Sequence, residues 1–308
     1  MERRYLVLVC SLNWLIFAGT GRPVATHVSA EQPTGESENA RLTLHAVRSS
    51  PLDLEVGGDV AGLAAGKTAF LSREELLALP QVTYNVDDDA NFKTSTQISG
   101  VLLEVLSDRV SASPQSDLII ALCEDKYRAN YPRSYVSGHH PILVMKINGK
   151  APADWPKDSE GHGLSLGPYL ISHVKFTPGF KILSHEDQAQ IPWGVIRIDF
   201  RDEPKTFGAI APRGATAQTK VVQEGYHIAR QNCFRCHNMA SEGGQKAGRS
   251  WLILSSWATA SPEYFGAYIR NPKSKNASAL MPGFPTYDEA TLQALTAYFR
   301  TFSSEEKR

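Results

Sequence analysis

Cys233-Phe234-Arg235-Cys236-His237 is the stretch that decides how the C-terminal part of this 308-residue chain folds. The spacing C-x-x-C-H is typical of covalent haem attachment, in which two thiols bond to the porphyrin and the adjacent histidine ligates the iron. A thioredoxin-like redox pair requires a βαβ setting and no histidine. A zinc site requires four protein ligands, and no second C-x-x-C or H-x-x-x-H pattern lies nearby. The motif therefore predicts one covalent haem c.

A haem held by His237 needs a second axial ligand, unless that position stays open for a small molecule. No histidine follows His237, and Met239 is too close in sequence to reach the opposite face. Met281 lies in Leu280-Met281-Pro282-Gly283-Phe284-Pro285, where two prolines exclude a helix and favour a rigid loop. A methionine that fills a gap in the core is the alternative. Ligation by Met and His raises the reduction potential and favours electron transfer over gas binding.

Helical patterns surround the motif. Residues 221–232 have helical spacing and run into it. Ser261-Pro262-Glu263 predicts an N-cap followed by proline at the first helical position, and Thr286-Tyr287-Asp288-Glu289 predicts a capping box. Gly225 would allow a close crossing by Tyr298, although an isolated glycine is also tolerated in a helix. The expected buried face of the last helix is Leu292, Leu295, Tyr298, Phe299 and Phe302.

Residues 220–302 resemble a class I cytochrome c domain. The resemblance is carried by Gly225-Tyr226, the C-x-x-C-H motif, Asn271-Pro272-Lys273, Met281-Pro282-x-Phe284 and Ala297-Tyr298-Phe299-Arg300. It implies an all-α fold that binds haem through thioether bonds at Cys233 and Cys236. It also implies His237 as the proximal and Met281 as the distal ligand of the iron.

One stretch departs from the cytochrome pattern. Many members carry a Gly-Pro-x-Leu turn soon after the haem motif, and its proline packs on the haem. Here the corresponding stretch is Gly248-Arg249-Ser250-Trp251-Leu252. Trp251 and Leu252 are the candidates to cover that side of the haem.

The first 30 residues are typical of a secretory signal peptide. Met1-Glu2-Arg3-Arg4 is basic, residues 5–19 are mostly apolar, and Val28-Ser29-Ala30 offers a cleavage site near Ala30. The apolar run is shorter than the ~20 residues of a membrane span, with an uncleaved anchor as the alternative. The sequence predicts an exported, periplasmic protein without a transmembrane span in the mature chain.

Cysteine usage agrees with this prediction, because Cys10 is removed with the signal and two of the remaining three thiols bind haem. Cys123 is left without a partner, so no disulfide framework is expected. The chain has 32 basic and 32 acidic residues and no basic stripe, which excludes a nucleic-acid-binding protein. The expected organisation is signal peptide 1–30, first domain 41–205, linker 206–219 and cytochrome domain 220–308.

Strand and helix patterns alternate in residues 41–205 and predict an α+β domain. A capping box at Ser72-Arg73-Glu74-Glu75 opens a short helix 74–79 that ends at Pro80. A second helix is expected at residues 100–110. The expected strands are residues 52–56, 82–86, 117–122, 142–147 and 193–200, with an Asn148-Gly149 turn after the fourth.

These elements resemble the oxidoreductase molybdopterin-binding domain of the sulfite oxidase family. The resemblance is carried by residues 71–80, 100–106, 124–132, and 142–149 followed by 163–169. In active members a cysteine thiolate after the strand that follows the early helix ligates molybdenum. Here that region, residues 84–92, contains no cysteine, and soft metal centres need thiolate or an equivalent ligand. Molybdopterin binding is therefore doubtful.

Three further groups of residues are candidates for metal binding. Cys123 on an apolar strand is typical of a small core residue rather than a ligand. Asp87-Asp88-Asp89 lacks the spacing of a calcium loop and favours a solvated acidic turn. The remaining candidates have no ligand spacing and favour solvated or core positions: His139, His140, His162, His173 and His185.

The sequence therefore predicts an exported monohaem cytochrome c that transfers electrons between redox partners. The first domain would serve as a docking or recognition module, and no residue is assigned a catalytic role. One alternative is a molybdopterin-dependent oxidoreductase that passes electrons from the first domain to the haem. Another is the electron-carrying subunit of a larger complex.

Overall fold

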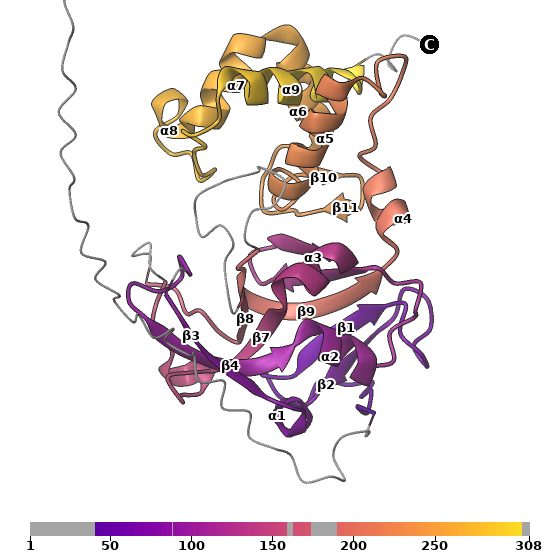
Figure 1. Cartoon of the computed structure of the whole chain (residues 1–308), viewed down its shortest axis with the longest axis vertical. Helices are drawn as coiled ribbons and strands as arrows, with labels where there is room; N and C mark the ends of the chain where they lie inside the picture. Colours follow the sequence, from indigo (N-terminus) through magenta and orange to yellow (C-terminus); the bar gives the residue numbers. More distant parts are fainter. Residues whose placement is uncertain (1–40, 88, 159–162, 174–189, 304–308) are drawn as a thin grey trace, which may run out of the picture.

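The computed structural model describes residues 41–87, 89–158, 163–173 and 190–303. The predicted signal peptide, with Cys10 and Ala30, lies outside the described residues, as do His162 and His185. A region of strands and short helices lies below a helical region, and helix α4 (Glu203–Gly208) joins them (Figure 1). No helix in the described part of the chain is long and apolar enough to cross a membrane.

The strands of the first region form one sheet, with order β2-β1-β9-β8-β7-β4-β3 and with β5 paired to β6 and β9. Strand β1 runs parallel to β9, and the other pairs are antiparallel. The strands are β1 (Leu54–Gly58), β2 (Thr68–Leu71), β3 (Val82–Val86), β4 (Thr96–Leu102), β5 (Leu118–Cys123), β6 (Arg128–Pro132), β7 (Pro141–Ile147), β8 (Tyr169–His173) and β9 (Trp193–Arg201). The helices are α1 (Arg73–Ala78), α2 (Leu103–Arg109) and α3 (Arg133–His139), with a short 3₁₀ turn η1 (Pro152–Asp154). The predicted α+β class is confirmed.

Local sequence signals placed several of these elements correctly. The Ser72 capping box is present, with both reciprocal hydrogen bonds. The predicted helix at 100–110 is wrong over its first turn, because β4 continues to Leu102 and α2 begins only at Leu103. Gly100 lies so close to β7 that a Cβ atom there would overlap the carbonyl oxygen of Leu143. Sheet pairing therefore overrides the helical spacing of the apolar residues.

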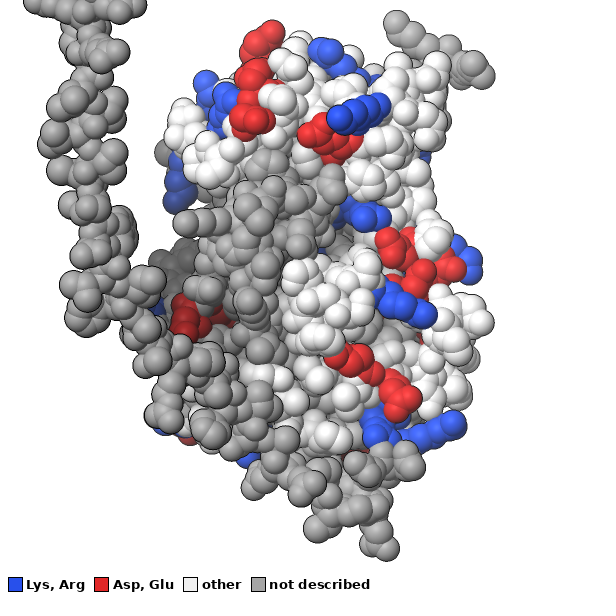
Figure 2. Space-filling view, in the orientation of Figure 1, with Lys and Arg blue, Asp and Glu red and all other residues white. Residues whose placement is uncertain are grey.

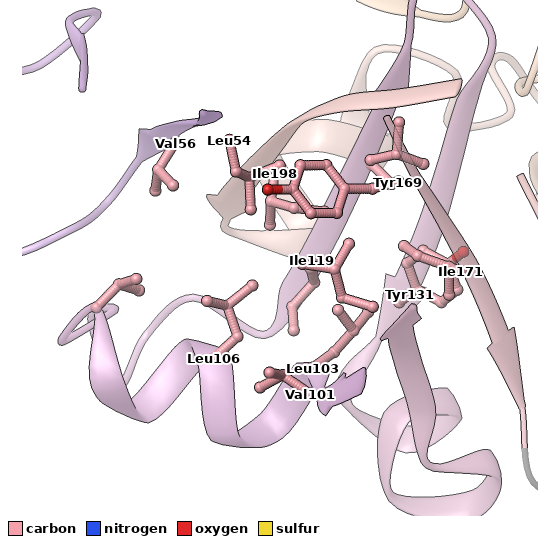
Figure 3. Close-up of a cluster of buried hydrophobic side chains, with 14 of the residues drawn as sticks. Leu54, Val56, Val101, Leu103, Leu106, Ile119, Tyr131, Tyr169, Ile171 and Ile198 are labelled. Atoms are coloured by element: carbon pink, nitrogen blue, oxygen red, sulfur yellow. The ribbon is translucent and has the colours of Figure 1, made fainter. Parts of the chain in front are cut away.

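Both faces of the sheet carry apolar clusters. In Figure 3, Leu103 and Leu106 of α2 point toward Ile119 and Ile198 of the sheet. All four side chains are buried, and burial of each contributes about 1.5–3 kcal/mol. A smaller cluster contains Val144 and Trp155. Val144 alternates along β7 with Leu143 and Met145 of the first cluster, so the smaller cluster lies on the opposite face of the sheet.

The C-terminal region is helical, as predicted. Its elements are α5 (Lys220–Asn232), β10 (Asn238–Met239), β11 (Glu242–Gly243), α6 (Trp251–Ala260), α7 (Pro262–Arg270), α8 (Pro272–Lys275) and α9 (Glu289–Arg300). The predicted start of α7 at Pro262 is confirmed, but Ser261 makes no side-chain capping bond. The predicted capping box at Thr286 is wrong. Helix α9 is capped by Asp288, whose carboxylate accepts a hydrogen bond from the backbone N–H of Thr291.

Helices α5 and α9 cross closely at Gly225, as the sequence predicted. A Cβ atom at Gly225 would overlap the backbone of Ala294 and lie 2.7 Å from Cβ of Tyr298. Tyr298 is fully buried; its hydroxyl donates to the carbonyl of Ile210 at 2.6 Å and accepts from Nε1 of Trp251 at 3.1 Å. The crossing therefore organises the helical core around Tyr298.

The predicted linker, residues 206–219, begins inside α4. Phe207 and Ile210 are buried in the same apolar cluster as the helical region, and Leu118 and Ile120 of β5 belong to that cluster. Apolar packing thus continues from the sheet into the helical region. The domain boundaries themselves stay a prediction.

Replacing Gly225 by alanine should destabilise the helical region by about 3 kcal/mol, because the new methyl group meets backbone atoms that cannot move aside. Urea unfolding followed by circular dichroism measures the change. Gly248→Ala is the matched control, since nothing lies within 4 Å of a Cβ atom there. Equal stability of the two variants would contradict the close crossing.

Candidate haem-binding site and its contact with the first domain

The C-x-x-C-H motif forms a compact turn at the end of α5. The backbone N–H of Cys233 donates to Ala229 at 2.8 Å, and that of His237 donates to Cys233 at 3.0 Å. The thiols of Cys233 and Cys236 are free and half-buried. Burial raises the pKa of Cys233 to about 12 and also raises that of Cys236, so both sulfurs are neutral thiols at neutral pH.

The imidazole of His237 is buried and oriented by one strong hydrogen bond. Its Nδ1 atom lies 2.6 Å from the carbonyl oxygen of Arg249. Because a carbonyl only accepts, Nδ1 carries the proton and the lone pair on Nε2 is left for a metal. Burial lowers the pKa of His237; the hydrogen bond to the Arg249 carbonyl opposes this shift, and the nearby Arg249 cation adds to it. The neutral form that binds metal is therefore favoured.

Met281 lies in a non-helical loop, as its two prolines predicted. The loop packs on α7, where the N–H of Phe284 donates to Ile269 at 3.0 Å. Met281 is half-buried and borders the same apolar cluster as Cys233, whereas Leu280 is 93% exposed. The described residues thus place a thioether and a thiol against one core. The haem-ligand roles of Cys233, Cys236, His237 and Met281 stay predictions, and the neutral thiols, the oriented imidazole and the thioether fit a haem c.

Trp251 and Leu252 occupy different environments. Trp251 is fully buried, with its ring 5.4 Å from Phe234 and 4.9 Å from Phe299. Leu252 is 48% exposed. Trp251 therefore belongs to the core behind the haem motif.

The haem motif also contacts the turn between β5 and β6 of the first domain. The N–H of Arg128 donates to the carbonyl of Arg235 at 2.9 Å, and the N–H of Gln245 donates to Lys126 at 3.0 Å. Lys246 and Asp125 form an ion pair at 2.5 Å beside these bonds. The hairpin turn is thus hydrogen-bonded to the motif itself.

Arg128 is the charged centre of this contact. Its side chain is 6% exposed, lies 5.4 Å from the centre of the Phe234 ring, and donates to Glu242 at 2.9 Å. Glu242 also accepts from Arg201 at 2.8 Å. Pairing offsets the cost of burying these charges. Sequence reasoning missed this network because its members lie far apart along the chain and share no motif.

The prediction of a solvated acidic turn is wrong for Asp89, and Asp88 lies outside the described residues. Asp87 is exposed, but Asp89 is buried and accepts from the hydroxyl of Ser172 at 2.5 Å and from the N–H of Asn91 at 2.8 Å. Burial raises the pKa of Asp89 to about 6, although these hydrogen bonds oppose the shift. Among the described residues, no three His, Cys, Asp or Glu side chains are arranged to hold a metal.

Two of the scattered histidines come together. His173 on β8 is fully buried, and its Nε2 atom lies 3.0 Å from the hydroxyl of Tyr135. The ring of His139 lies 6.3 Å from that of His173. Burial lowers the pKa of His173 to about 3, and His139 adds to the effect. His140 instead contacts Glu104 at 2.7 Å. Spacing gave no sign of the His139–His173 pair, because its members come from α3 and β8.

Cys123 is buried in the core of the first domain, as the sequence indicated. Burial also raises the pKa of its thiol. On the face shown in Figure 2, basic and acidic side chains are interspersed among neutral ones. This distribution agrees with the zero net charge of the chain.

Comparison with known proteins identifies the helical region. Residues 220–299 match the family model described as cytochrome c oxidase, cbb3-type, subunit III, and form a cytochrome c domain of that type. Among solved structures, the chain is similar to the sulfane dehydrogenase SoxCD from Paracoccus pantotrophus, at 15% identity and a TM-score of 0.32. That similarity covers 56% of this chain and 45% of the SoxCD chain, so this chain spans less than half of its length. No curated protein matches the chain.

Asp89 should make stability depend on pH. Its pKa is about 6 in the folded protein and 3.8 ordinarily, so folding favours the protonated form. Its contribution is present below about pH 4 and is lost as pH rises through 6, by up to about 3 kcal/mol. Asp89→Asn should therefore gain stability over the parent protein between pH 4 and 7 in urea unfolding.

Asp87→Asn is the control, because it removes an exposed carboxylate from the same turn. A stability difference between Asp89→Asn and the parent protein that stays constant from pH 4 to 7 would exclude a titrating buried Asp89.

Proposed function

We propose that this protein is an exported monohaem electron carrier whose single haem c is bound by Cys233, Cys236, His237 and Met281. The observation that carries the proposal is the oriented imidazole of His237, which stands beside two free thiols in a cytochrome c domain. A bound haem c supplies a one-electron couple.

Each residue has a defined part in this proposal. The thiols of Cys233 and Cys236 would hold the porphyrin, and Nε2 of His237 and the thioether of Met281 would hold the iron. The proline-bracketed loop limits the movement of Met281. Two protein ligands on fixed segments would keep structural rearrangement between oxidation states small. No proton needs to move, so no acid–base residue is assigned.

The place of action and the partners follow from the leader sequence and the C-x-x-C-H motif. A signal peptide cleaved near Ala30 would deliver the chain to the periplasm, where haem is attached. The electron donor and acceptor would be redox proteins, or neighbouring subunits if the chain belongs to a larger complex. The first domain would serve as the docking module.

A second candidate function is a molybdopterin-dependent oxidoreductase that passes electrons within one chain. The contact between the haem motif and the β5–β6 turn favours it, because the backbone of Arg128 is bonded directly to that of Arg235. The missing cysteine opposes it. Asp89, a buried carboxyl, lies within the region where the resemblance implies a thiolate.

Elemental analysis of protein exported from a host that makes both cofactors separates the two functions. An electron carrier should contain one iron and no molybdenum per chain. Near-stoichiometric molybdenum would establish the oxidoreductase instead. Absence of covalently bound iron would refute both functions.

Replacing Met281 by alanine should abolish the Met-to-iron charge-transfer absorption of the oxidised protein and lower its reduction potential, because a thioether ligand favours reduced iron. Visible spectroscopy and a redox titration measure the two effects. Met239→Ala is the matched control, since that methionine lies two residues past His237 and is too close in sequence to reach the opposite face. An unchanged spectrum and potential in Met281→Ala would show that another group is the distal ligand.

A further inference from the structure

The carbonyl that orients His237 lies near the end of a loop whose described backbone N–H bonds stop before Arg249. The loop 244–250 separates β11 from α6 and forms no regular structure. Before Arg249, the last backbone N–H with a described hydrogen bond is that of Ala247. It donates to the carbonyl oxygen of Cys236 at 3.0 Å. Gly248 follows with open space around it. This is where the cytochrome resemblance implies a proline, which would have stiffened the backbone.

The side chain of Arg249 supplies the missing anchor. Its guanidinium carbon lies 4.8 Å from the centre of the Trp257 ring and 5.6 Å from that of Tyr268. The ring centres of Trp257 and Tyr268 lie 5.6 Å apart, and the ring planes meet at 68°. The two rings therefore form two walls beside the guanidinium. Among the described residues, no carboxylate forms an ion pair with Arg249. Cation–π attraction is therefore its main side-chain contact.

The rings of Trp257 and Tyr268 are both fixed by packing within the helical region. Tyr268 is 5% exposed on α7, and Trp257 is half-buried on α6. The ring of Tyr264, which is 41% exposed, lies 5.6 Å from that of Trp257 and has no described contact to Arg249. Helices α6 and α7 therefore position the guanidinium, and through it the backbone carbonyl that faces His237.

We infer that Arg249, clamped by Trp257 and Tyr268, is a positioning residue for the proximal ligand and replaces the stiffening effect of the absent proline. The clamp holds the Arg249 carbonyl at hydrogen-bond distance from Nδ1 of His237. This bond keeps the imidazole in one orientation and strengthens its donation to the iron. The inference rests on the proposed haem ligation by His237.

The first test is Trp257→Leu, which removes one wall but keeps the positive charge of Arg249. The Nδ1–H of His237 should exchange with solvent about five- to tenfold faster in the reduced protein, measured by ¹⁵N NMR. The reduction potential should shift upward, because a weaker hydrogen bond makes the imidazole a poorer donor. Trp257→Phe keeps an aromatic wall and should restore both properties.

Two further variants make the test specific. Tyr264→Leu removes a ring of the same aromatic group that does not touch Arg249, and it should leave exchange and potential unchanged. Arg249→Gln keeps all three rings and should accelerate exchange as Trp257→Leu does. If Trp257→Leu does not fold, the exchange rate of the His237 Nδ1–H in Arg249→Gln tests the clamp instead.

Unchanged exchange in Trp257→Leu and Arg249→Gln would overturn the clamp, as would an equal effect of Tyr264→Leu. A parent protein without covalent haem absorption would instead refute the proposed function. The two failures are therefore distinguishable.

Discussion

The close crossing of α5 and α9 is the constraint on which the helical region depends. Gly225 lets the backbones of the two helices meet at Ala294, a distance that any side chain at position 225 would prevent. This places Tyr298 in the centre of the core, where its hydroxyl joins Trp251 on α6 to Ile210 in the connecting segment. Because the haem motif begins where α5 ends, the same crossing determines where the motif stands.

The motif is held from a second side by the first domain. Backbone hydrogen bonds tie the β5–β6 hairpin to Arg235 and Gln245, and Glu242 joins Arg128 to Arg201 across the same contact. A buried arginine is stable there only because the carboxylate and the Phe234 ring replace the water that it loses. Separating the two regions would expose these groups without partners, at a cost in free energy. The protein environment of the haem motif is therefore fixed on that side.

Burial in the first domain shifts the pKa values of His173 and Asp89 toward their uncharged forms. Burial lowers the pKa of His173 to about 3, so its imidazole is uncharged at neutral pH, and Tyr135 gives it a hydrogen-bond partner. Asp89 pairs with Ser172, and its pKa of about 6 lies close to neutral pH. Each of the two groups has a hydrogen-bond partner from a distant segment of the chain. A molybdenum site in this region would need a soft ligand in addition.

The sequence by itself determined the elements whose signals are local. Helix α5, the cap of α1 at Ser72, the proline-bracketed loop at Met281 and the crossing at Gly225 were all predictable, because each depends on neighbouring residues or on one glycine. Only the tertiary structure decided the strand at Gly100, the burial of Asp89, the pairing of Arg128 with Glu242 and the clamp on Arg249. These depend on partners from distant segments, and a single sequence carries no periodicity or spacing that brings such partners together.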